Sequence, residues 1–329
     1  MPPRTKGAAA WRACLWSALV LGPARTARAN DVSDELTVGT LSPSTSSSSS
    51  TRVSSEPFVS DRLGGALDAS DNVSLSLDGT LTRYLHANHE PGETIFQIAT
   101  ALDYDGDHWS FGIDARGSPR STAVTRTDSG PVRSRTSLLG AGAFIEYDSA
   151  GESDEKSSGG IDPETIVEGS GGVTEYWTTQ RARHGGSSPS SLTQFRLSLG
   201  VTEVLWRDTE GALFANWYTY STDPLNTGYY GASVFGRESV SDGLPLEPLR
   251  WSIRPSLRQR MGPVKVSAYF QYGRYVGDAG SNVLGGLKAQ IKVSQVLKLW
   301  ASGGLQHDVQ STGETLLVPW AAVGARVTF

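Results

Sequence analysis

Apolar and polar residues alternate along the end of this chain. Counting back from Phe329, every second residue is apolar (Val327, Ala325, Val323 and Ala321), and the residues between them are small, polar or charged. Successive side chains of a strand point to opposite faces, so this segment has one apolar and one polar face. A strand of a soluble sandwich shows the same alternation, so the rest of the chain decides between the two.

Similar alternating runs recur after Asn72, separated by turn residues. No long stretch has apolar residues at the i, i+3, i+4 and i+7 positions of a helix. Repeated alternating segments with turns between them are typical of transmembrane β-barrels. We therefore predict strands at Val73–Ala87, Thr94–Tyr104, His108–Arg116, Arg135–Asp148, Val173–Arg183, Thr193–Arg207, Gly211–Ser221, Gly228–Glu238, Leu249–Arg260, Val264–Val276, Val283–Ser294, Val296–Asp308 and Thr315–Phe329.

These runs give thirteen strands, whereas bacterial single-chain barrels have an even number. With the C-terminus in the periplasm, Ser294-Gln295 falls in a short periplasmic turn and the acidic segment Ser149–Gly172 falls outside. Successive connections then alternate between the periplasmic and the outer side, up to the N-terminal end, only if a further strand lies within Arg120–Thr127. We predict an all-β fold, a transmembrane antiparallel up-and-down β-barrel of fourteen strands, with twelve and sixteen as the alternatives.

Prolines and tryptophans both bear on this prediction. Pro255 and Pro319 fall inside predicted strands, and each requires a bulge or a strand end because proline cannot donate to a ladder. Trp109, Trp206 and Trp251 lie at strand ends, where amphipathic rings suit the aromatic girdles of a bilayer interface. Tryptophan also favours strands in general, but the predicted strands carry too few apolar residues for a soluble double-sheet core.

Residues 1–29 have the organisation of a secretory signal peptide. Arg4, Lys6 and Arg12 precede an apolar run from Ala13 to Leu21, and Ala27-Arg28-Ala29 forms a small-residue cleavage site. The run is shorter than the roughly 20 residues of a membrane helix; a disordered basic N-terminus is the alternative. Cleavage after Ala29 removes the single cysteine, which excludes disulfides, thiolate metal sites and cysteine nucleophiles from the mature chain.

Residues 30–71 have the composition of a linker. Ser42 to Ser55 consists almost entirely of serine and threonine, with little apolar surface to bury. Such a segment cannot offset the entropy of ordering itself. We therefore predict a disordered linker at 30–71 and the β-barrel at 72–329.

The pattern as a whole resembles the Gram-negative outer-membrane β-barrels of the porin-like kind. The resemblance rests on the predicted signal peptide, the series of strands and the terminal strand ending in Val327 and Phe329. It implies an integral position in the outer membrane of a Gram-negative bacterium. It also implies contact with outer-membrane lipid and recognition of the terminal strand, Phe329 above all, by the barrel insertion machinery.

A second, weaker likeness concerns Tyr218–Gly236, which resembles barrel domains that follow helical repeats in exporters of secreted polysaccharides. This chain has no helical-repeat region, so the likeness implies a free-standing barrel.

Basic residues gather on the polar face of the last strands. From Glu247 onward there are ten Lys and Arg against four acids, whereas the whole chain has a net charge of −5. Because a cation on the lipid face costs about 2–4 kcal/mol at the bilayer midplane, we expect these residues to face the lumen. The predicted basic wall consists of Arg250, Arg254, Arg258, Arg260, Lys265, Lys288, Lys292, Lys298 and Arg326. A partial counter-wall is predicted at Asp78, Asp103, Asp114, Glu146 and Asp148.

A basic wall inside a water-filled barrel favours the passage of anions, and fourteen strands leave room for water. We expect a channel for anionic or sugar-type solutes, with export of an anionic polysaccharide as a narrower form. Two alternatives stay open: charges that pair across and plug the lumen, and a structural or adhesive barrel that displays outer loops.

An enzyme is not expected. The five histidines lie near strand ends or in loops and in no nucleophile motif. His86, His89 and Glu90 lack a further ligand, so no metal site is predicted. The sequence likewise predicts no cofactor and no nucleic-acid partner.

Overall fold

A computed structural model describes most of the chain from Ala29 onward. The described residues are 29–42, 44–47, 50–53, 56–85, 94–127, 130–149, 165–182, 187–206, 208–224, 249–278, 280–310 and 315–329. In these ranges we find no helix of the length and apolarity required to cross a membrane.

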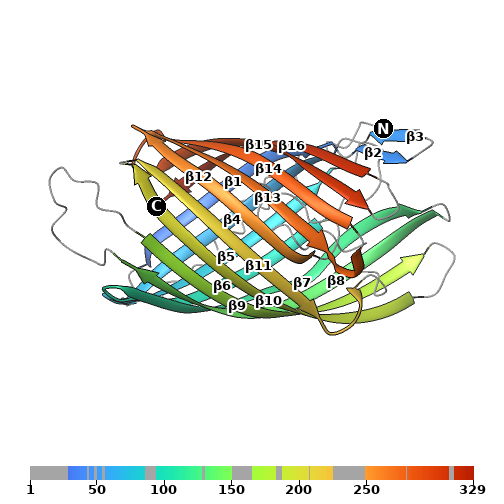
Figure 1. The fold of residues 1–329 in the computed structure, drawn as a ribbon, viewed down its shortest axis with the longest axis horizontal. Helices are drawn as coiled ribbons and strands as arrows, with labels where there is room; N and C mark the ends of the chain where they lie inside the picture. The colour runs from blue at the N-terminus through green and yellow to red at the C-terminus, as the bar shows by residue number, and fades with distance from the viewer. Residues whose placement is uncertain are drawn as a thin grey trace, which may run out of the picture.

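One antiparallel sheet closes on itself into a barrel of fourteen tilted strands, because β1 pairs with both β4 and β16 (Figure 1). This confirms the predicted fold class and strand number. The short β2 (Ser44–Ser47) and β3 (Ser50–Val53) extend the sheet beside β16. The barrel strands are β1 (Ala29–Leu41), β4 (Glu56–Ser70), β5 (Val73–Tyr84), β6 (Thr94–Asp105), β7 (Trp109–Thr127), β8 (Gly130–Asp148), β9 (Thr165–Ala182), β10 (Ser187–Trp206), β11 (Thr209–Tyr220), β12 (Leu249–Met261), β13 (Val264–Tyr275), β14 (Gly280–Lys292), β15 (Leu297–Gln310) and β16 (Thr315–Thr328).

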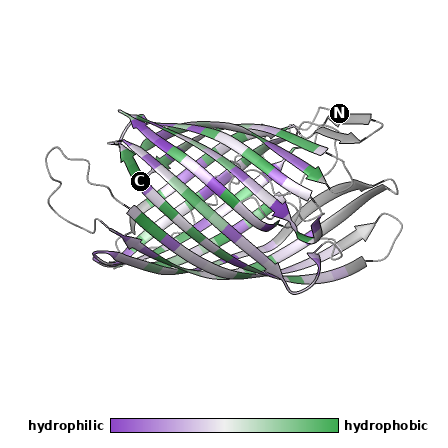
Figure 2. Cartoon of the chain, in the orientation of Figure 1, coloured by the Kyte–Doolittle hydropathy of each residue, from purple (hydrophilic) through white to green (hydrophobic). Residues whose placement is uncertain are grey.

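The outer surface is apolar, as the alternation predicts. Leu287 is 62% exposed and Val323 is 56% exposed. Trp320, which lies on the opposite face of the same strand as Val323, is 5% exposed. Hydrophobic and hydrophilic residues alternate along the strands in Figure 2. Hydrocarbon is the solvent that tolerates so many exposed apolar side chains around a closed sheet. The polar alternates therefore face the lumen.

The two ends of the barrel differ in their connections. We call the end that holds Phe329 the turn end, because 71–72, 106–108, 207–208, 262–263 and 293–296 connect strands there. The opposite end, the loop end, includes the connection between β11 and β12. The connection from Asp148 to Thr165 also leaves from the turn end. The prediction that Ser149–Gly172 lies outside, opposite the C-terminus, is therefore wrong, and its last residues, from Thr165, belong to β9.

The predicted linker at 30–71 is corrected by β1 and β4, which close the barrel. Leu36 and Val38 are exposed on the outer face of β1, and Leu63 is exposed on the outer face of β4. Asp34 and Asp61 share those outer faces, and Phe58 faces inward. Charged outer positions and an apolar inner position interrupt the alternation here, and the serine- and threonine-rich Ser42–Ser55 led to the prediction of disorder. The barrel accordingly begins at Ala29, the last residue of the predicted signal peptide, and residues 1–28 of that peptide lie outside the described residues.

Two predicted strands do not stand separately in the barrel. Arg120–Thr127 is the end of β7, which continues to Thr127 and pairs with β8. Gly228–Glu238 lies outside the described residues, and β11 pairs directly with β12. The number fourteen is thus right, but β1 and β4 supply two of the strands.

The two prolines occupy openings in the ladder. Pro255 pairs with Leu213 on one side, while pairing with β13 passes from Ile253 to Ser256 without a change of register. Pro319 lies beyond the last pair between β1 and β16, and its carbonyl accepts a hydrogen bond from the Ser42 N–H at 3.0 Å. Pro255 thus lies in a local gap of the β12–β13 ladder, and Pro319 lies past the end of the β1–β16 ladder.

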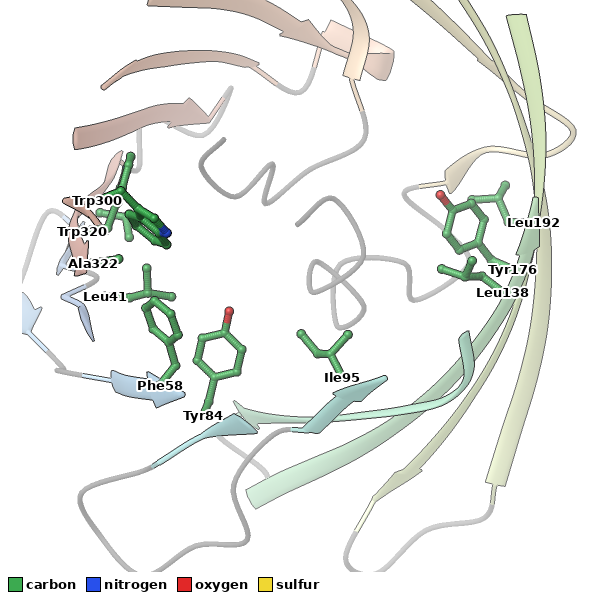
Figure 3. Packing of buried hydrophobic residues seen from close by; sticks show 11 residues of the cluster. Leu41, Phe58, Tyr84, Ile95, Leu138, Tyr176, Leu192, Trp300, Trp320 and Ala322 are labelled. Atoms are coloured by element: carbon green, nitrogen blue, oxygen red, sulfur yellow. The ribbon is translucent and has the colours of Figure 1, made fainter. Parts of the chain in front are cut away.

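Apolar side chains also line part of the inner wall towards the loop end. Figure 3 shows Leu41, Phe58 and Tyr84 pointing inward on one side of the lumen, and Tyr176 and Leu192 on the other. The side chain of Phe58 is completely buried. This apolar lining leaves the ionised side chains concentrated in the half of the lumen nearer the turn end.

Candidate functional site

The predicted basic wall lies on the inner face of β12 to β16 for most of its members. Arg254 and Arg258 line a hollow in the lumen. Lys288 lies 4.7 Å from the centre of the inward-facing Trp300 ring. Arg326 donates to the Ser33 hydroxyl at 2.9 Å, and Ser33 is buried on the inner face of β1.

Five cations of this wall sit close to the turn end. Lys265 is the register partner of Arg260, and Lys298 is the register partner of both Lys292 and Arg326. Arg260 and Lys292 are exposed near the ends of their strands. The last three strands thus carry a row of cations across the mouth of the lumen.

Arg250 departs from this arrangement. It lies at a register shift between Leu249 and Trp251, near the loop end of β12. Its side chain is exposed. A bulge redirects side chains relative to the regular alternation, so the alternation alone does not place Arg250 in the lumen.

An acidic wall faces the basic wall from β5 to β9. We use this name for the inward side chains of Asp78, Asp103, Asp114, Glu146 and Glu168. Glu146 and Glu168 are register partners, and Asp103 and Asp114 project beside the inner-face glycines Gly112 and Gly142. Sequence reasoning missed Glu168, because its segment was assigned to a loop.

The strands between the two walls form two borders, β10–β11 and β1–β4, and an ion pair links each border to the neighbouring wall. Arg258 Nη1 lies 2.6 Å from Glu210 Oε2 between β12 and β11. Arg62 Nε lies 3.0 Å from Asp78 Oδ1 between β4 and β5. All four side chains are partly exposed to the lumen, so each pair stabilises the fold by about 0–1 kcal/mol at most. Their larger effect is on the potential inside the barrel.

A hollow of about 530 Å³ lies at the border near β11. We call it the niche. Arg254 is the register partner of Phe214, and its guanidinium carbon lies 4.4 Å from the centre of the Tyr269 ring. The niche is lined by Glu168, Thr202, Glu210, Ala212, Phe214, Asn216, Arg254, Ser256, Leu257, Arg258, Ser267, Ala268 and Tyr269.

Inward-facing aromatic rings lie directly over glycines of the neighbouring strand. In each case the ring and the glycine are register partners, and a Cβ on the glycine would stand within 3.0 Å of the ring. A ring that lies flat against backbone projects less into the lumen than one that stands upright. The pairs are Phe58 with Gly39, Phe144 with Gly112, Phe214 with Gly200, Tyr269 with Gly286, Trp300 with Gly324, and Trp320 with Gly304.

A buried carboxylate joins β13, β14 and β15 near the loop end. Asp308 accepts hydrogen bonds from the Tyr275 hydroxyl, from Asn282 Nδ2 at 2.6 Å and from Gln306 Nε2 at 2.7 Å. Its side chain is almost fully buried. Three donors satisfy this charge, so Asp308 fixes these strands to one another.

The predicted insertion signal lies on the outside of the barrel. Phe329 is 77% exposed, and its N–H donates to the Val32 carbonyl at 2.8 Å. Val327 is the register partner of Asp34 and Leu297. Recognition of these residues by the insertion machinery stays a prediction.

The described side chains include no group of three or more His, Cys, Asp or Glu arranged to hold a metal ion.

Comparison with known proteins gives the fold and no family. No family model matches the chain, and no curated protein matches it. Among solved structures, the deltaS2 mutant of the monoaromatic hydrocarbon channel TodX has a TM-score of 0.52 and 8% identity, over 91% of this chain and 89% of that one. The TodX deltaS2S3 mutant has a TM-score of 0.50 and 10% identity, over 91% and 90%. The fold is that of an outer-membrane β-barrel.

Proposed function

We propose that this protein is an outer-membrane channel for small anionic and sugar-type solutes. The observation that carries the proposal is the distribution of charge inside the barrel. The basic wall on β12 to β16 lies opposite the acidic wall on β5 to β9. Fixed charges of opposite sign on facing walls create a potential gradient across the lumen, which low-dielectric walls focus.

This arrangement refines the expectation of a purely anion-concentrating pore. Anions would follow the basic wall past Arg254, Lys298 and Arg326, and cations would follow the acidic wall. Neutral solutes rich in hydroxyl groups would align their dipoles across the lumen and exchange hydrogen bonds with both walls. The acidic wall therefore reduces the preference for anions over cations, and the barrel also favours polar solutes over apolar ones.

Export of an anionic polysaccharide is a narrower form of the same proposal. The row of Lys292, Lys298 and Arg326 at the turn end supports it, because a polyanion entering there would meet cations on three neighbouring strands.

The outer-membrane position in a Gram-negative bacterium is part of the proposal. It is supported by the apolar outer surface, exemplified by Leu287 and Val323, and by the outer-membrane β-barrel fold.

Conductance in planar bilayers tests the proposal against the alternative of a closed structural barrel. The refolded chain should give discrete single-channel steps that persist at low voltage. Liposomes containing it should also release or take up a small neutral sugar faster than empty liposomes do. A barrel that inserts, as judged by protection of its strands from protease, but conducts neither ions nor sugar would contradict the channel.

A further inference from the structure

We propose that the niche is a binding site for a ring-bearing carboxylate, meaning an organic acid whose single carboxylate is attached to a five- or six-membered ring. This inference rests on the proposed channel function and names a solute class for it.

The carboxylate would be bound by Arg254. A guanidinium offers donors in a planar fork that matches a carboxylate in a bidentate pair. Arg254 is the register partner of Phe214 on β11, and its guanidinium lies over the Tyr269 ring. A planar cation resting on a ring keeps its orientation, which suits it to receive an anion from the lumen.

The ring of the solute would lie against the aromatic side chains. Phe214 lies over Gly200 and Tyr269 lies over Gly286, so both rings are held close to the backbone. Because one face of each ring lies against backbone, the other face is open to a solute along the wall of the niche. An aromatic ring, or the C–H face of a sugar ring, gains dispersion and apolar contact on such a surface.

The other lining residues restrict the charge and polarity of the solute. Glu210 already pairs with Arg258, and Glu168 also lines the niche. A second negative charge on the solute would meet these carboxylates, so a monoanion fits better than a dianion. Asn216 and Ser256 add groups that can donate or accept hydrogen bonds at its edge.

Isothermal titration calorimetry on the refolded full chain in detergent tests this. Benzoate and glucuronate are the two probes, because they share the ring-bearing carboxylate and differ in the ring. Acetate lacks the ring, and benzyl alcohol and glucose lack the carboxylate. At least one ring acid should bind roughly tenfold more tightly than acetate and than its neutral counterpart. Binding of benzoate alone would identify aromatic acids as the solute class, and binding of glucuronate alone would identify sugar acids.

Two variants separate the niche from the channel as a whole. Arg254→Gln should abolish the preference for the ring acid over its neutral counterpart, and Phe214→Leu should reduce the preference over acetate. Arg250→Gln, an exposed arginine on the same strand that does not line the niche, is the matched control and should leave binding unchanged. Equal binding of acetate, binding unaffected by Arg254→Gln, or no binding of either acid would overturn the proposal. Normal conductance alongside any of these would leave the channel function standing.

Discussion

Glu210 and Arg258 face each other across β11 and β12 with their charged atoms 2.6 Å apart, at the border between the acidic and basic walls. Because this pair is partly exposed, its contribution to stability is small. Its position gives it a larger effect on ions that pass, because the carboxylate of Glu210 neutralises one cation of the basic wall.

Removing Glu210 should therefore change selectivity more than stability. In Glu210→Gln, we expect the reversal potential in a salt gradient to shift towards anions, because Arg258 loses its counter-charge. The free energy of unfolding should fall by no more than about 1 kcal/mol. Arg258→Gln should shift the reversal potential the other way. Equal reversal potentials in the two variants would show that the pair does not line the ion path.

The buried Asp308 should matter for stability. In Asp308→Ala, the Tyr275 hydroxyl and the amides of Asn282 and Gln306 lose their shared acceptor. Leaving buried donors unsatisfied costs about 1–3 kcal/mol, so the midpoint of thermal unfolding, followed by circular dichroism in detergent, should fall clearly. Asp103→Ala, which removes a partly exposed inward acid, is the matched control and should have little effect. An unchanged midpoint for Asp308→Ala would contradict the bracing role.

The aromatic rings that lie over glycines should keep the lumen wide. In Gly324→Ala, the new methyl group would meet the Trp300 ring and push it into the lumen. We expect a smaller single-channel conductance and a loss of stability of about 1–3 kcal/mol, the range for overpacking. Gly79→Ala provides the control, because a Cβ at Gly79 meets no atom within 4 Å. If both variants conduct like the wild type, Trp300 does not border the conducting path.

Phe329 should affect insertion in cells and not folding in vitro. Its side chain is exposed, and its backbone bond to Val32 does not depend on the ring. Phe329→Ala should refold into detergent with the same yield, while the amount assembled in the outer membrane, measured by fractionation, should drop. Equal assembly of the variant would remove Phe329 from the predicted insertion signal.

The alternation of residues was enough to predict the barrel and its outer face. Leu287 and Val323 point outward because a lipid-facing position requires an apolar side chain, and that requirement is written into the local sequence. The inward placement of Arg254 and Lys288 follows from the same rule. These features depend only on neighbours along one strand, so one sequence suffices to predict them.

Features that depend on pairing between strands escaped prediction. Asp34 and Asp61 on outer faces concealed β1 and β4, and closure by β1 is a property of the whole ring. Glu168 joins the niche only because β9 begins at Thr165, earlier than its weak alternation indicated. The contact of Phe214 with Gly200 requires the register of β10 and β11, which local patterns do not specify.

The reversal potential of the open barrel in a salt gradient tests the central claim of two opposed walls most directly. Neutralising the basic wall with Arg254→Gln, Lys298→Gln and Arg326→Gln should shift it towards cations. Neutralising the acidic wall with Asp103→Asn, Asp114→Asn and Glu168→Gln should shift it towards anions. Opposite shifts of this kind are the predicted result. Shifts in the same direction, no shift in either variant, or no conductance from the folded wild type would contradict the account.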